Sequence, residues 1–255
     1  MTIDIDALFR LDGRTAIVTG GTRGIGLAIA EGFAAAGANV VVASRKADAC
    51  ESVAAELVGR GHRAIGVPTH LGSLEDVHRL VGATTDAFGG IDVVVNNAAN
   101  ALTEPIGGFT ESGFTKSIDV NVKGPLFLIQ ESLPHLRESD HASVINVVSA
   151  GAWLYSSFVA MYAAAKAAMV SYTKSLAAGL ADDGIRVNAL APGAVDTDMV
   201  RNTGQASADH MANACLLRRL ASADEMVGPA LFLASDASSF LTGSVVHADG
   251  GLVTR

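Results

Sequence analysis

Short runs of β-branched residues alternate with longer alanine-rich stretches along almost the whole chain. Runs such as Val40-Val41-Val42 and Val93-Val94-Val95 contain no alternating polar positions, which predicts strands buried on both faces. Strands of this kind are typical of a parallel sheet covered by helices on each side. Strands are expected at residues 15–19, 39–43, 64–67, 92–95, 143–148, 186–190 and 244–247, and helices at 24–36, 46–60, 74–88, 111–137, 157–181 and 224–234.

This alternation predicts an α/β protein with a Rossmann fold, a doubly wound, seven-stranded parallel sheet with helices on both faces. The length of 255 residues allows one or two domains at about 150 residues each. Because the strand and helix units use the whole chain, we expect a single domain, 1–255, with cofactor and substrate at the same sheet edge. Residues 192–215 show no clear period, so they are expected to form a substrate-binding loop or lid.

Composition narrows the function classes. With 49% hydrophobic and 17% charged residues, the chain can fill a sizeable core. A net charge of −8 disfavours nucleic acid and anionic membrane surfaces as partners. Two cysteines cannot form a disulfide framework, and the histidines have no metal-ligand spacing, so no metal is predicted. Acidic residues at the N-terminus and the lack of a long apolar stretch favour a cytoplasmic protein without a signal peptide or membrane span.

A glycine-rich segment, Thr19-Gly20-Gly21-Thr22-Arg23-Gly24-Ile25-Gly26, follows the first predicted strand and opens a predicted helix. Glycines permit a tight turn and close backbone approach, so the N-terminus of the helix can receive a pyrophosphate. An ordinary structural turn is the alternative, because many strands end in glycines. The strand before the segment and the helix after it favour a dinucleotide site.

Tyr162 and Lys166 lie four positions apart in a predicted helix and therefore share one face. A free tyrosine has a pKa near 10, too high to release its proton readily at neutral pH. A nearby lysine ammonium and an oxidised nicotinamide would both favour the phenolate and lower that pKa. A buried tyrosine beside an exposed lysine is the structural alternative.

In their order and spacing, these motifs resemble those of the short-chain dehydrogenase/reductase family, over nearly the whole chain. The elements of the resemblance are the octet Thr-Gly-x-x-x-Gly-x-Gly, Asn96-Asn97-Ala98-Ala99, Asn121, Ser149, Tyr162-x-x-x-Lys166 and Pro192-Gly193. Such a match is specific for the family but not for the substrate.

The resemblance assigns roles to four catalytic residues. Tyr162 is the expected general acid in reduction and base in oxidation, and Ser149 is expected to bind the substrate oxygen. Lys166 is expected to lower the pKa of Tyr162 and to bind the nicotinamide ribose. Asn121 is expected to hold a water that links Lys166 to solvent.

The charge after the second predicted strand bears on the choice of nicotinamide cofactor. NAD sites commonly place an acid about 20 residues beyond the glycines, whereas this chain has Ser44-Arg45-Lys46 there. Arg45 could pair with a 2′-phosphate, and Arg23 is similar to a second basic position in NADP-preferring members, so NADP(H) is predicted. The alternative is that Arg45 and Lys46 are only solvated residues at a helix start.

The cofactor contacts expected from the resemblance run along the whole carboxyl edge of the sheet. Two positions depart from the family pattern: His70 stands where an Asp or Asn contacts adenine, and Ala99 replaces a glycine. The expected contacts are Gly20, Thr22, Arg23, Gly24, Ile25, Gly26, Ser44, Arg45, His70, Leu71, Asn97, Ala98, Ala99, Tyr162, Lys166, Pro192, Gly193, Val195 and Thr197.

The substrate is less well defined. Large side chains between Ser149 and Tyr162, namely Trp153, Leu154, Tyr155 and Phe158, suggest a hydrophobic or ring-bearing substrate, although some could instead face the core or another subunit. We therefore expect an NADP(H)-dependent oxidoreductase that interconverts a carbonyl and a secondary alcohol on an apolar or cyclic small molecule. The alternatives are a 3-oxoacyl-thioester reductase, acting on an acyl-carrier-protein or coenzyme A substrate, and a non-catalytic dinucleotide-binding regulator. Enoyl reduction is disfavoured, because relatives with that activity space their tyrosine and lysine more widely. The resemblance also implies a homotetramer.

Overall fold

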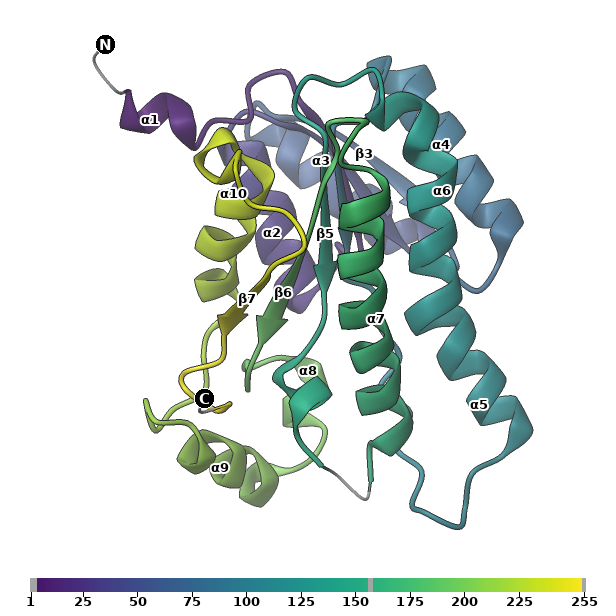
Figure 1. Ribbon diagram of the computed structural model, residues 1–255, viewed down its shortest axis with the longest axis vertical. Coiled ribbons are helices and arrows are strands. Elements are labelled where there is room, and N and C mark those ends of the chain that lie inside the picture. The colour runs from purple at the N-terminus through teal and green to yellow at the C-terminus, as the bar shows by residue number, and fades with distance from the viewer. Residues whose placement is uncertain (1–3, 156–157, 254–255) are drawn as a thin grey trace.

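The computed structural model describes residues 4–155 and 158–253, and it contains one sheet of seven parallel strands (Figure 1). The order across the sheet is β3-β2-β1-β4-β5-β6-β7. The predicted α/β Rossmann fold is confirmed. The strands are β1 (Thr15–Thr19), β2 (Asn39–Ser44), β3 (Arg63–Pro68), β4 (Val93–Asn96), β5 (Ser143–Val147), β6 (Arg186–Pro192) and β7 (Val245–Ala248).

The order of the strands reverses between β1 and β4, which are neighbours in the sheet. The chain builds outward from β1 to β3 and then crosses back to β4. In an open α/β sheet the crevice at the carboxyl ends of such a strand pair is the usual ligand-binding position. The fold therefore places the glycine-rich turn after β1 beside the Asn96-Asn97 segment that ends β4.

Helices cover both faces of the sheet, as predicted. In Figure 1, α2 and α10 lie over one face, and α4, α6 and α7 lie over the other. No helix in the described ranges is long and apolar enough to cross a membrane. The helices are α1 (Ile5–Leu8), α2 (Gly24–Ala35), α3 (Ala47–Gly59), α4 (Leu74–Phe88), α5 (Glu111–Ile118), α6 (Gly124–Leu136), α7 (Ala160–Gly179), α8 (Asp198–Arg201), α9 (Gln205–Ala214) and α10 (Val227–Ala234).

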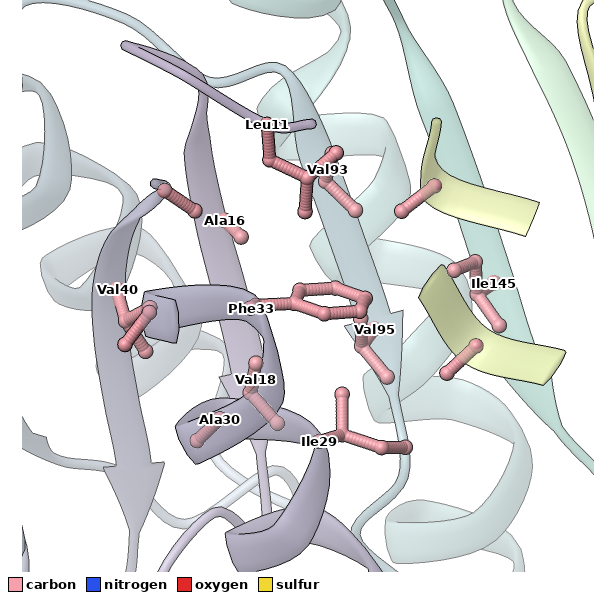
Figure 2. Packing of buried hydrophobic residues seen from close by; sticks show 14 of the residues in the cluster. Leu11, Ala16, Val18, Ile29, Ala30, Phe33, Val40, Val93, Val95 and Ile145 are labelled. Carbon is pink, nitrogen blue, oxygen red and sulfur yellow. The ribbon is translucent and has the colours of Figure 1, made fainter. Parts of the chain in front are cut away.

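The valine runs supply both halves of the core. Val40 and Val42 pack with Phe33 of α2 on one face, whereas Val41 packs against the helices of the opposite face. Figure 2 shows the ring of Phe33 lying against β1 and β4, next to Val18 and Val95. Burial of these strands on both faces explains why their sequences show no alternation.

Two predicted segments differ from the structure. The single helix expected at 111–137 is two helices, α5 and α6, joined by a π-helical turn, Asp119–Lys123. The segment 192–215, expected to be a loop, contains α8 and α9. Helix α9 buries only Ala208, so its sequence carries almost no apolar period. The expected start of α7 at residue 157 lies outside the described residues.

Candidate active site

The glycine-rich turn lies at the carboxyl end of β1 and is held by the loop after β4. Gly20 and Gly24 have φ of +67° and +54°, a backbone conformation that favours glycine. A side-chain carbon at Gly26 would lie 2.3 Å from both Asn97 Nδ2 and the carbonyl oxygen of Gly20. Asn97 Nδ2 in turn donates a hydrogen bond of 2.8 Å to the carbonyl of Thr19. The glycines are therefore required by close packing of two loops, as well as by the conformation of the turn.

The N-terminus of α2 is suited to an anion. Its capping residue, Arg23, is extended, and within the described residues its side chain makes no capping hydrogen bond to the helix. The first turn of α2 contains no acidic residue. Its backbone N–H groups and the positive end of the helix dipole are consequently available to a phosphate group. These features fit the pyrophosphate of a nicotinamide dinucleotide.

The end of β2 adjoins the glycine-rich turn, as a site for the adenosine ribose requires. Thr22 Oγ1 donates a hydrogen bond of 3.1 Å to Ser44 Oγ, so the turn and the strand end are linked directly. Arg45 follows on the exposed side, and no described residue forms an ion pair with it. Arg23 instead lies 3.4 Å from Asp198 Oδ2 at the start of α8. Of the two basic residues predicted to bind the 2′-phosphate, Arg23 therefore forms an ion pair, whereas Arg45 has no ion-pair partner among the described residues.

His70, the first departure from the family pattern, is held by hydrogen bonds at its ring and its backbone. Its Nδ1 accepts a hydrogen bond of 3.1 Å from the backbone N–H of Gly72, so the neutral ring carries its proton on Nε2. The backbone N–H of His70 donates to Asp76 Oδ2 at 2.8 Å. The neighbouring Leu71 is buried. Held in this way, the imidazole offers an N–H donor where the family pattern has an Asp or Asn.

The segment after β6 borders the same crevice. A side-chain carbon at Gly193 would lie 2.6 Å from Asp249 Cα, so the C-terminal turn packs directly on Pro192-Gly193. Thr197 lies against the glycine-rich turn, because a side-chain carbon at Gly24 would be 3.2 Å from Thr197 Cγ2. Val195 is buried beside Ala221. Ala98 packs at the edge of the core, and both it and Ala99 are partly buried.

Ser149, Tyr162 and Lys166 meet at the end of β5. Ser149 caps a short 3₁₀ turn, with its Oγ accepting a hydrogen bond of 3.0 Å from the N–H of Gly151. A further hydrogen bond joins Ser149 and Tyr162. Lys166 is fully buried, and its Nζ lies 5.6 Å from the centre of the Tyr162 ring. The structure thus brings together three of the four predicted catalytic side chains.

Burial is the largest cause of the pKa shifts of Tyr162 and Lys166. Desolvation raises the pKa of Tyr162 above its ordinary value, and the hydrogen bond with Ser149 opposes that shift. Desolvation lowers the pKa of Lys166 to about 7. The sequence predicted a lowered pKa for Tyr162, but in the protein without cofactor the pKa is raised. At neutral pH the phenol keeps its proton, as a general acid must.

Asn121 fixes the loop after β4. It lies in the π-helical turn between α5 and α6 and is buried. Its Oδ1 accepts a hydrogen bond of 2.9 Å from the backbone N–H of Asn100, and its Nδ2 donates one of 2.8 Å to the carbonyl of the same residue. Nδ2 also donates to Ser117 Oγ at 3.2 Å. The amide is thus committed to holding Asn100, a residue for which the sequence gives no signal.

The large side chains after Ser149 differ in their surroundings. Trp153 is 41% exposed and packs against the imidazole of His247, with ring centroids 4.6 Å apart. Tyr155 and Phe158 are largely exposed. The contact with His247 was not anticipated, although the histidine stands just before the Asp249-Gly250-Gly251 turn that the sequence does mark. In the described ranges, no cluster of histidine, cysteine and carboxylate side chains could hold a metal ion.

Comparison with known proteins gives extensive matches. A family model described as Enoyl-(Acyl carrier protein) reductase matches residues 20–253. The chain is 39% identical over 249 residues to the short-chain dehydrogenase/reductase SDRA of Arabidopsis thaliana, which covers 96% of this chain and 97% of the relative. It is 37% identical to dehydrogenase/reductase SDR family member 4 of Sus scrofa, over 96% of this chain and 89% of the relative. A crystal structure of a gluconate 5-dehydrogenase from Burkholderia cenocepacia in complex with NADP and tartrate is similar with a TM-score of 0.94 and 33% identity, covering 99% of this chain and all of that one.

Proposed function

Since the chain belongs to the short-chain dehydrogenase/reductase family and is an NAD(P)-dependent oxidoreductase, we propose that it interconverts a carbonyl and a secondary alcohol on an apolar or cyclic small molecule, with NADP(H) as cofactor. The observation that carries this proposal is the group Ser149, Tyr162 and Lys166 at the end of β5, beside a glycine-rich turn that fits a dinucleotide.

The protein residues supply positioning and the proton. A bound nicotinamide supplies or accepts the hydride. Ser149 hydrogen-bonds the substrate oxygen and holds it at the phenol of Tyr162. In reduction, Tyr162 donates its phenolic proton to that oxygen, and in oxidation the phenolate takes the proton back. The ammonium of Lys166 near the ring stabilises the phenolate left after donation.

The preference for NADP(H) rests on the charge at the end of β2. Arg45 is exposed next to Ser44, and the two residues after it, Lys46 and Ala47, are not acidic; the next acid along the chain is Asp48, in the first turn of α3. A guanidinium there can bind a 2′-phosphate through a forked pair of hydrogen bonds. Arg23 joins it once its side chain leaves Asp198, a pair that exposure to solvent makes weak.

The apolar character of the proposed substrate rests on exposed side chains around the crevice. Trp153 ends the 3₁₀ turn after Ser149 and Leu154 follows it, Met199 belongs to the expected lid at 192–215, and Leu216 and Leu217 come just after that lid; each of these side chains is at least 41% exposed. A polyol or sugar acid would gain little from such a surface. This surface favours a ketone with a ring or an apolar substituent.

A 3-oxoacyl thioester is the second candidate, because an acyl chain would also suit an apolar surface. The arginines in and just after residues 192–215 do not favour a phosphate-bearing carrier. Arg201 pairs with Asp196 at 2.8 Å, Arg219 pairs with Glu225 at 2.7 Å, and Arg218 donates to the carbonyl of Asn213. Enoyl reduction stays outside the proposal because Tyr162 and Lys166 are only one helical turn apart.

A homotetramer remains part of the proposal. The exposed face of α7 consists mainly of small residues, which suits close packing against a second subunit. Light scattering tests this directly. A monomer would contradict it.

The activity is tested by following the near-ultraviolet absorbance of the reduced nicotinamide with a panel of carbonyl compounds. The panel contains cyclic and aromatic ketones, diketones, acetoacetyl-coenzyme A and gluconate-derived keto acids, with NADH in parallel. Turnover should be greatest with a cyclic or aromatic ketone and NADPH. Tyr162→Phe should lower kcat by at least about 100-fold and change the Kd of NADPH little.

Retained turnover in Tyr162→Phe would contradict the catalytic assignment. Best turnover with acetoacetyl-coenzyme A would favour the thioester reductase. Tight NADPH binding without turnover of any compound would favour a dinucleotide-binding regulator.

A further inference from the structure

Trp153 lies four residues after Ser149, at the end of the turn that Ser149 caps. It is the one tryptophan in the chain and ends the 3₁₀ turn, Ala150–Trp153, that Ser149 caps. That short turn fixes the backbone of Trp153 relative to Ser149, whose Oγ accepts the hydrogen bond from the N–H of Gly151. The side chain is 41% exposed, which leaves part of the aromatic surface available to another molecule.

The buried side of the indole rests on His247. The two ring centroids are 4.6 Å apart and the planes are tilted by 51°, a geometry typical of favourable aromatic contact. His247 belongs to β7, where it pairs with Ala191 of β6, the residue before Pro192-Gly193. Its side chain is only 14% exposed, so the imidazole is itself held in place.

Asp249 fixes the backbone that carries this histidine. Its carboxylate accepts hydrogen bonds from the N–H groups of Gly251, at 2.9 Å, and Val253, at 3.0 Å. One carboxylate oxygen lies 3.7 Å from His247 Nδ1. The contact between the rings of Trp153 and His247 thereby connects the Ser149 turn with β7 and the C-terminal turn. Figure 1 shows the C-terminal segment next to the carboxyl ends of β6 and β7, above α9.

We propose that Trp153 is a specificity-determining residue that forms an aromatic wall of the substrate site, and that His247 is a positioning residue that sets the plane of its indole. The inference rests on the proposed function, because it names the part of the ketone that meets this wall: a flat ring or aryl group attached to the carbonyl carbon. A small linear ketone held by Ser149 and Tyr162 does not need the wall.

The proposed role of Trp153 is tested by comparing kcat/KM for two ketones, one with a ring and one small and linear. Trp153→Ala should lower kcat/KM for an aryl or cyclic ketone by about tenfold or more and leave that for a small linear ketone within about twofold. His247→Ala should raise KM for the aryl ketone by about 3- to 10-fold with kcat nearly unchanged. His247→Phe, which keeps an aromatic ring, should restore most of the KM. His78→Ala, an exposed histidine of α4, is the matched control and should behave as wild type.

The single tryptophan gives a readout that does not depend on turnover. His247→Ala should red-shift the emission of Trp153 and make it easier to quench with acrylamide, whereas His247→Phe and His78→Ala should not. Selectivity that is unchanged in Trp153→Ala, or a His247→Phe variant as impaired as His247→Ala, would overturn the inference while leaving the proposed function intact. A wild-type protein that turns over no ketone would instead contradict the proposed function, and unchanged emission in His247→Ala would separately refute the positioning role.

Discussion

The ammonium of Lys166 donates a hydrogen bond of 2.7 Å to the backbone carbonyl of Val147, the last residue of β5. This bond ties α7 to the end of the strand from which Ser149 follows two residues later. It is made inside the protein, because Lys166 is 1% exposed. An amine buried in this way sets the position of the Tyr162 turn, and because burial lowers its pKa to about 7 it also makes the stability of the protein depend on pH.

The stability of the protein should depend on pH through Lys166. The folded pKa is about 7 and the unfolded pKa is about 10.4, so between these values the unfolded state binds more protons and the free energy of unfolding rises with pH. Lys166→Met lacks this group. Relative to that variant, the wild-type free energy of unfolding should rise by about 1 kcal/mol per pH unit between about pH 7 and pH 9. Urea unfolding at several pH values measures it, and a difference that stays constant would contradict the shifted pKa.

Gly26→Ala should damage the cofactor site. The added carbon would lie 2.3 Å from Asn97 Nδ2, which must then give up its position against Thr19. We expect a loss of about 1–3 kcal/mol in the free energy of unfolding and weaker NADPH binding, measured by thermal unfolding and nucleotide titration. Gly82→Ala in α4, where the carbon meets nothing within 4 Å, should instead stabilise the protein by up to about 1 kcal/mol. Equal effects of the two substitutions would argue against the close approach of the two loops.

Asn121→Ala should lower activity by releasing Asn100. The substitution removes both hydrogen bonds to that backbone, at a cost of about 1–3 kcal/mol, and lets the loop after β4 move. We expect a lower kcat together with a lower Tm. Ser117→Ala removes only the 3.2 Å bond and should have the smaller effect on both quantities. A Ser117→Ala variant as impaired as Asn121→Ala would contradict the claim that Asn121 acts through its two hydrogen bonds to Asn100.

Arg45→Asp should reverse the proposed cofactor preference. Loss of a guanidinium and gain of a carboxylate beside a 2′-phosphate should raise the Kd of NADPH by about tenfold or more, with a much smaller change for NADH. Isothermal titration of both nucleotides measures this. Arg63→Ala is a suitable control, because Arg63 lies at the amino end of β3 over the ring of Phe88. Tighter NADPH binding by Arg45→Asp, or a wild type that prefers NADH, would contradict the prediction.

Much of the fold follows from the local sequence. Uninterrupted runs such as Val93-Val94-Val95 predict strands buried on both faces, and the structure gives each of these valines no exposed surface. The glycine-rich turn is similarly marked, because a conformation with positive φ at Gly20 and a close approach at Gly26 admit almost no other residue. In contrast, α9 could not be recognised, since a surface helix that buries a single alanine shows no apolar period.

Local sequence patterns predicted a glycine-rich turn after β1, a serine after β5, and a tyrosine and a lysine one helical turn apart on α7. These are short-range patterns, set by backbone conformation and by burial of neighbouring residues. Three other features arise from the packing of the folded chain: Asn121 holds Asn100, His247 packs against Trp153, and burial raises the pKa of Tyr162. Each of these depends on how separate elements pack, because hydrogen bonds, ring contacts and desolvation act between atoms close in space, whatever their distance along the chain.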